Sequence, residues 1–207
     1  MKRVYELAIY KFSLFFIIIL IISSCGNNDF GLLPTFSKKK ALQAVVEIPA
    51  GTNHKLEYNY DLKKIVIDSI DGKERIIDFL PYPGNYGFIP STKMDKKRGG
   101  DGDALDVLII SESQASGSVM EIVPIGVLLL KDSGEIDTKI IAIPFEEEHR
   151  IIKVKDFKGF SSKYSEAKQI IEDWFLNYKG KGRVDLYGWK DEKAALLEIK
   201  KWQLNKK

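Results

Sequence analysis

The stretch "VMEIVPIGVLLLKDSGEIDTKIIAIPF", residues 119–145, contains two apolar runs joined by a short acidic segment. Apart from Glu121, Thr138 and Lys139, the runs at 119–130 and 138–145 lack polar side chains, which is typical of strands buried on both faces. Between them, "KDSGEID" carries Asp132 and Gly134, residue types that favour turns. We therefore expect the second strand to pair back antiparallel on the first, as a hairpin.

Shorter strands are expected before this hairpin, at 42–48, 54–62, 64–70, 75–80 and 106–110. The dipeptide Asp71-Gly72 lies between two of them and predicts a tight hairpin. The segment "PYPGNYGFIP", residues 81–90, is dense in proline and glycine and is expected to be a loop.

After residue 160 the apolar period changes from strand to helix. A helix is expected within 161–179, with Ser161 or Ser162 as its N-cap and Gly180 as its stop. Its apolar face would comprise Tyr164, Ala167, Ile170, Ile171, Trp174, Phe175 and Tyr178. Asp191 can cap a second helix that runs to about Gln203. This helix would bury Ala195, Leu196, Ile199 and Trp202. The outline is α+β and mainly β: a compact sheet or barrel closed by two late helices.

The N-terminus differs from the rest of the 207-residue chain. Basic residues precede an apolar run at 12–22, which is short for a membrane span, and Ser23, Ser24 and the single cysteine, Cys25, follow. "IISSC" resembles a bacterial lipobox. It predicts a lipoprotein signal peptide at 1–24, a lipid on Cys25 and a tether at 25–40 before a domain at 41–207. The protein would be exported and membrane-anchored on the periplasmic or outer side of a bacterial envelope. An uncleaved signal-anchor with an incidental cysteine is the alternative.

Five aspartates fall in two glycine-containing turns. Asp101, Asp103 and Asp106 lie in "RGGDGDALDV", residues 98–107, and Asp132 and Asp137 lie in "KDSGEID", residues 131–137. An acidic turn before a strand is common for backbone reasons alone. If the two turns meet, however, so many carboxylates require cations to neutralise them. Hard oxygen ligands without histidine or thiol suit Mg²⁺ or Mn²⁺ rather than zinc. An EF-hand is excluded because the fifth and sixth loop positions hold Leu105 and Asp106.

Basic and phenolic residues occur in comparable places. Lys55 and Glu57 share one strand face, as do Asp137 and Lys139. Further candidates are Arg75, Tyr86, Tyr178 and Lys179. Together with divalent metal ions these groups describe a site for a multiply charged oxyanion.

Six blocks of sequence resemble the soluble, Mg²⁺-dependent family I inorganic pyrophosphatases. They are "VVEIPAG", "HKLEY", "PYPGNYGFIP", "GGDGDALDVL", "KDSGEIDTKIIAIP" and "NYKG…YGW", and they span about residues 44–190. The resemblance implies an OB-like five-stranded β-barrel with flanking hairpins and two C-terminal helices. It also implies hydrolysis of pyrophosphate to two phosphates, with Mg²⁺, Mn²⁺ or another divalent ion, in a protein expected to be a homo-oligomer.

The resemblance also assigns roles to residues. Asp101, Asp106 and Asp137 would hold the metal ions around the attacking water, and Asp132 with Asp137 a further substrate-bound ion. Asp103 would be the general base. The phosphate contacts would be Lys55, Arg75, Tyr86, Tyr178 and Lys179. Lys139 would lie beside the metal carboxylates, and Glu47 and Glu57 in the outer part of the site. Ala104 departs from the family pattern, which usually has proline or glutamate there, and we expect a looser loop without loss of chemistry.

Two other functions stay open from the sequence. One is a catalytically silent, lipid-anchored module that binds divalent metal or a phosphorylated ligand. The other is nucleic-acid binding through the barrel. The net charge of +3, which falls to about +1 without residues 1–24, and the acidic turns argue against a nucleic-acid partner.

Overall fold

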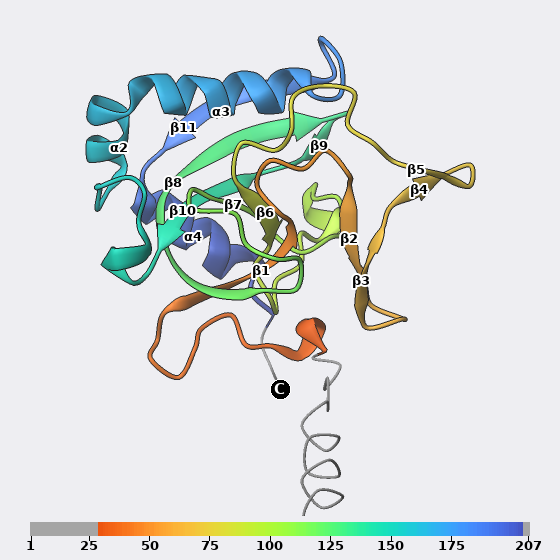
Figure 1. Cartoon of the computed structure of the whole chain (residues 1–207), viewed down its shortest axis with the longest axis horizontal. Helices are drawn as coiled ribbons and strands as arrows, with labels where there is room; N and C mark the ends of the chain where they lie inside the picture. Colours follow the sequence, from red (N-terminus) through yellow and green to blue (C-terminus); the bar gives the residue numbers. More distant parts are fainter. Residues whose placement is uncertain (1–28, 205–207) are drawn as a thin grey trace, which may run out of the picture.

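In a computed structural model that describes residues 29–204, five strands close into a ring (Figure 1). Around the ring they are β1 (Leu42–Ile48), β6 (Asn85–Phe88), β7 (Asp106–Ile109), β10 (Lys139–Pro144) and β8 (Val119–Asp132). Pairing of β8 with β1 closes it. β7 and β10 run parallel, and the other neighbours in the ring are antiparallel. The predicted mainly-β barrel is confirmed.

The long strand β8 organises the sheet because it pairs with four others. Its first part pairs with β1, its middle with β10, and its end with β9 (Glu135–Ile136) and β11 (Val184–Lys190). The predicted antiparallel pairing of 119–130 with 138–145 is therefore confirmed. The turn itself is shorter than expected: Ser133 and Gly134 take left-handed φ angles of 52° and 90°, and strand residues flank them.

The prediction of a loop over residues 81–90 is wrong at its centre, which forms β6. All four residues of this strand are buried. Gly87 explains the misleading sequence, because a Cβ atom there would lie 1.9 Å from the carbonyl oxygen of Val45 on β1. The glycine thus permits a close approach of two strands rather than marking a turn.

Two small hairpins lie outside the ring, β2 (Leu56–Asn59) with β3 (Lys64–Ile67) and β4 (Ser69–Ile70) with β5 (Lys73–Glu74). They extend to one side in Figure 1. The predicted turn at Asp71-Gly72 is confirmed, with φ angles of 54° and 73°. The strand expected at 75–80 is wrong, since there only Ile76 forms a bridge, to His54.

Among residues 29–204, the α-helices that cover the ring are α2 (Phe157–Lys163), α3 (Ser165–Asn177) and α4 (Glu192–Trp202). The predicted N-cap at Ser161 or Ser162 is wrong. Asp156 caps α2 by accepting the Gly159 N–H at 2.7 Å, and the chain breaks at Tyr164 before α3 begins. The predicted cap of the last helix, Asp191, is confirmed.

The helices bury most of the apolar faces that their periodicity predicts. α3 buries Ile171, Trp174 and Phe175, and α4 buries Ala195, Ile199 and Trp202. Ile170 and Leu196 are exceptions, with 60% and 38% of their surface exposed. α3 and α4 thus cap two separate apolar clusters of the sheet.

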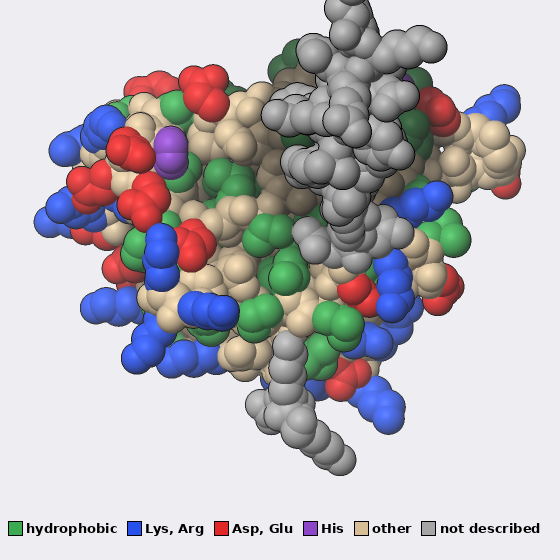
Figure 2. Space-filling model, turned by 60° about the horizontal axis from the view of Figure 1, so that its bottom comes forward, with side chains coloured by type: hydrophobic (Ala, Val, Ile, Leu, Met, Phe, Trp, Pro, Cys, Tyr) green, Lys and Arg blue, Asp and Glu red, His purple; other side chains and the backbone are tan. Residues whose placement is uncertain are grey.

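The described chain begins and ends on one side of the ring. The Ser91 hydroxyl donates to the Leu33 carbonyl at 2.7 Å, and the Ser91 carbonyl accepts the Leu204 N–H at 2.9 Å. Figure 2 brings this side forward, with hydrophobic side chains near its centre and basic side chains around them. Single-turn 3-10 helices lie at η1 (Phe30–Leu32), η2 (Lys96–Arg98) and η3 (Glu147–His149).

The predicted signal peptide and Cys25 lie outside the described residues. Within residues 29–204, no helix is long and apolar enough to cross a membrane. The later part of the predicted tether lies against the domain, since Thr35 is 2% exposed and its hydroxyl donates to the Pro90 carbonyl at 3.0 Å.

Candidate active site

A cavity of about 410 Å³ opens where β2, β6, β7 and the end of β8 meet the loop after α3. Every residue predicted for catalysis, metal, substrate or the outer acidic site lines it. They are Glu47, Lys55, Glu57, Arg75, Tyr86, Asp101, Asp103, Asp106, Asp132, Asp137, Lys139, Tyr178 and Lys179. Residues more than 100 positions apart in the sequence thus line the same cavity. The role of each of them stays a prediction.

The aspartate loop is fixed by its own backbone. Gly99 and Gly102 take left-handed φ angles of 86° and 97°, and the Asp101 carboxylate accepts the Asp103 N–H at 2.9 Å. Met94 ties the loop down, since its N–H donates to the Asp103 carbonyl at 2.7 Å and its carbonyl accepts the Gly102 N–H at 2.8 Å. These bonds leave the exposed Asp103 side chain on a constrained backbone.

Asp106 opens β7, and its register partner on the parallel strand β10 is Lys139. The Lys139 ammonium lies 2.5 Å from Asp106 Oδ2, 2.5 Å from Asp137 Oδ1 and 3.0 Å from the Tyr86 hydroxyl. Tyr86 donates in turn to Asp106 Oδ2 at 2.5 Å. Burial favours the neutral amine, but the two carboxylates outweigh it and hold the pKa of Lys139 well above its ordinary value. Lys139 therefore stays charged.

Two acidic side chains of the cavity hold protons more tightly than usual. Burial, together with the charges of Asp106 and Asp103, raises the pKa of Asp101 to about 6. Burial also raises the pKa of Glu47 to about 8, although its carboxylate accepts the Tyr58 N–H at 2.7 Å. Both shifts mean that negative charge here is unfavourable without further cations.

Basic groups line the same cavity and are already oriented by carboxylates. Lys55 pairs with Glu57, and Lys179 with Asp132. Burial and the neighbouring Arg75 lower the pKa of Lys55. The Arg75 guanidinium donates to Asp68 at 3.0 Å. These cations could bind a phosphate that displaces or shares their carboxylate partners.

Tyr178 is held by the aromatic side chains behind it. Its ring stacks on Trp174 with centroids 4.5 Å apart and an interplanar angle of 10°. Trp174 is fixed in turn, because its indole N–H donates to the Leu80 carbonyl at 2.9 Å. Tyr178 thus reaches the cavity from a rigid support at the end of α3.

The donor set fits Mg²⁺. The candidate ligands Asp101, Asp106, Asp132 and Asp137 offer only hard carboxylate oxygens. Within residues 29–204, no three Asp, Glu, His or Cys side chains are arranged to hold a metal ion by themselves. Mg²⁺ typically takes one or two carboxylates and completes its shell with water and substrate phosphate oxygens. The cavity therefore suits an ion that binds together with its substrate.

Sequence reasoning missed several residues that line the cavity, among them Tyr60, Tyr82 and Glu135. Tyr82 lies in residues 81–90, for which the sequence predicts a loop. Glu135 belongs to the acidic turn "KDSGEID", so its charge was a usable signal. Ala104 also lines the cavity and packs against the buried cluster of Val45, Tyr58 and Phe88, which gives the aspartate loop an apolar support.

Comparisons with known proteins agree with this geometry. A family model described as inorganic pyrophosphatase matches residues 44–207. The inorganic pyrophosphatase of Thermus thermophilus is 35% identical over 171 residues, 78% of this chain and 87% of that protein. That of Aquifex pyrophilus is 36% identical over 181 residues, 85% and 94% of the two chains. The crystal structure of the Thermus thermophilus enzyme matches with a TM-score of 0.69 over 83% of this chain and 95% of that one, at 34% identity.

Proposed function

The chain belongs to the family I soluble inorganic pyrophosphatases and hydrolyses inorganic pyrophosphate, and we propose that it does so with Mg²⁺ in the cavity described above. The family uses Mg²⁺. The proposed ligands are Asp101, Asp106, Asp132 and Asp137. The observation that carries the proposal is the convergence of these four carboxylates and three basic side chains, Lys55, Arg75 and Lys179, on one cavity.

Pyrophosphate resists attack because its negative oxygens repel a nucleophile. Bound Mg²⁺ neutralises part of that charge and lowers the pKa of water in the site. Asp103 orients the attacking water and takes its proton while the new P–O bond forms and the bridging P–O bond breaks. Lys55, Arg75 and Lys179 hold the phosphoryl oxygens and stabilise the charge that grows on the departing phosphate.

Chelation tests the metal requirement. Full-length protein, purified in detergent and treated with EDTA, should release no phosphate from pyrophosphate, and added Mg²⁺ should restore release, with Mn²⁺ as a weaker substitute. Phosphate is measured by a colorimetric assay, and circular dichroism before and after chelation controls for loss of fold. Undiminished phosphate release in EDTA would contradict the metal-dependent mechanism.

We also propose that the enzyme is exported and held at a bacterial membrane by a lipid on Cys25. The order of basic residues, apolar run, small residues and cysteine supports this proposal. The homo-oligomer expected from the sequence stays a prediction.

Metabolic labelling tests the lipid anchor. Cells grown with a clickable fatty acid should label the wild-type protein strongly, and Cys25→Ala should lose the label because the acceptor thiol is gone. Asn28→Ala, which lies in the predicted tether and leaves residues 1–25 unchanged, serves as the matched control. Equal labelling of wild type and Cys25→Ala would refute lipidation at this residue.

A further inference from the structure

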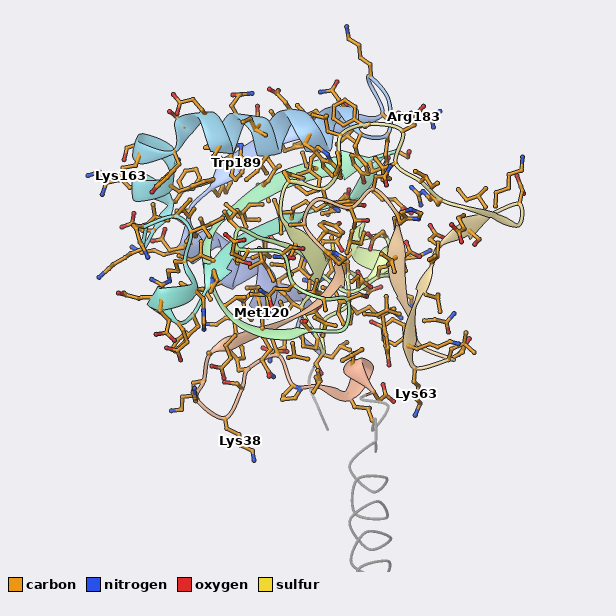
Figure 3. The ribbon with its side chains drawn as sticks, viewed as in Figure 1. Lys38, Lys63, Met120, Lys163, Arg183 and Trp189 are labelled. Atoms are coloured by element: carbon orange, nitrogen blue, oxygen red, sulfur yellow. The ribbon has the colours of Figure 1, made fainter. Side chains whose placement is uncertain are left out.

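The first described residue, Asp29, joins the N-terminal segment to the β2–β3 hairpin. Its carboxylate accepts the Tyr58 hydroxyl at 2.8 Å, and its other oxygen pairs with Lys63 at 2.9 Å. It also caps η1 by accepting the Gly31 N–H at 3.2 Å. Tyr58 lies on β2 and Lys63 in the turn that follows it, as Figure 3 shows for Lys63 at the end of the hairpin. One carboxylate therefore holds both the strand and its turn.

Tyr58 is the residue through which this hairpin is seated on the domain. It is the one buried side chain of β2 and β3, with 6% of its surface exposed. Its ring packs against Phe30 of η1, with centroids 5.5 Å apart, and against Phe88 of β6, at 5.8 Å. Its backbone N–H donates to Glu47, which belongs to the candidate site. The tyrosine thus contacts the N-terminal segment on one side and the ring on the other.

The hairpin depends on such contacts because β2 and β3 form a two-stranded sheet of their own, outside the seven-stranded sheet. Lys55 and Glu57 lie immediately before and within β2. The Lys55 N–H donates to the Arg75 carbonyl at 2.9 Å, so a shift of the hairpin would also displace Arg75. A displacement of about 1 Å is enough to weaken binding geometry strongly.

We propose that Asp29, acting through Tyr58, is a positioning residue that holds Lys55 and Arg75 in place for pyrophosphate. The proposal rests on the phosphate-binding role proposed above for those two residues. The N-terminal segment, which the sequence predicts to be a tether, thereby also helps to position the residues that bind the substrate. Asp29 lies four positions after Cys25, so the segment that would carry the membrane anchor is the same one that seats the substrate-binding hairpin.

A double-mutant cycle on the full-length protein in detergent, with saturating Mg²⁺, tests the proposal. Tyr58→Phe removes only the hydroxyl, and Asp29→Ala removes its acceptor. Tyr58→Phe should raise the KM for pyrophosphate about fivefold, the effect expected from one lost hydrogen bond, with kcat within about twofold of wild type. Asp29→Ala should raise KM at least as much, because it also removes the ion pair with Lys63 and the cap of η1. The double variant should be no worse than Asp29→Ala alone, because that variant has already lost the bond to Tyr58. Asp29→Asn, which keeps an acceptor oxygen, should recover part of the loss.

Ser91→Ala is the matched control, since it removes a different hydrogen bond to the same segment, at Leu33, away from β2. Its KM should stay at the wild-type value. An unchanged KM in Tyr58→Phe, or an equal rise in Ser91→Ala, would overturn the proposal. If Asp29→Ala does not fold, Tyr58→Phe remains decisive because its ring packing is kept. Lys55→Met separates the two claims: an unchanged KM there refutes the phosphate role itself, whereas a raised KM with a normal Tyr58→Phe refutes only this inference.

Discussion

Replacement of Asp103 by asparagine is expected to lower kcat for pyrophosphate hydrolysis by about a thousandfold, the usual contribution of a general base. Asparagine keeps the shape of the side chain but cannot take a proton from water. The hydrogen bonds that fix the loop use the Asp103 N–H, which donates to the Asp101 carboxylate, and the Asp103 carbonyl, which accepts the Met94 N–H, so they do not involve the Asp103 side chain. The fold and the unfolding temperature should therefore stay within about 2 °C of wild type.

The measurement is steady-state phosphate release at saturating pyrophosphate and Mg²⁺. Glu135→Gln is the matched control, because Glu135 is an exposed carboxylate that lines the same cavity without an assigned role. It should change kcat by less than about fivefold. A loss of less than tenfold in Asp103→Asn, or an equal loss in Glu135→Gln, would contradict the assignment of the base.

Lys139→Met should produce the largest loss of stability among the site variants. Lys139 is 2% exposed and is the shared partner of Asp106 and Asp137, whose side chains are 23% and 10% exposed. Removal of the ammonium leaves two partly buried carboxylates facing each other, which costs about 3 kcal/mol in comparable cases. Activity should fall more than a hundredfold, because the same carboxylates are proposed to hold Mg²⁺ in a defined geometry.

Urea unfolding of the EDTA-treated protein measures this stability loss. Lys201→Met removes a lysine of similar size from an exposed pair with Glu198, and should cost less than about 1 kcal/mol. Added Mg²⁺ should restore part of the stability of Lys139→Met, since it supplies positive charge at the same carboxylates. Equal stability of the two variants would show that the buried ion pairs do not hold the site together.

The strands β8 and β10 were predictable because their sequences are mostly apolar, which is enough to indicate strands buried in the core. The strand β6 was not predictable, because Gly87 allows a close approach to β1 that is evident only in the folded ring. Similarly, the start of α2 was missed because Asp156 precedes a segment without a clear helical period, and Ser161, inside it, offered a better local cap. Local sequence patterns therefore do not predict an element that depends on a distant strand, as β6 does, or a helix as short as α2.

The residues of the candidate site also differ in how far the sequence predicts them. The charged residues were predictable from residue types at strand ends and from the family resemblance, because carboxylates and lysines that the strand pattern does not explain can be recognised in the sequence. The bond between Asp29 and Tyr58 was not predictable, because residues 26–40 show no periodicity and their contacts depend on tertiary structure. Tyr60 and Tyr82 likewise line the cavity through the placement of the hairpin and β6.

Two aspartates of one loop are proposed to have different roles, with Asp101 holding metal and Asp103 taking a proton. A Mg²⁺ titration of phosphate release by Asp101→Asn and Asp103→Asn distinguishes these roles. We expect Asp101→Asn to need about tenfold more Mg²⁺ for half-maximal rate and to regain most of its kcat at saturation, the effect of one weakened ligand. Asp103→Asn should keep the wild-type Mg²⁺ requirement and stay slow at every concentration. Identical titration curves for the two variants would refute this division of roles between Asp101 and Asp103.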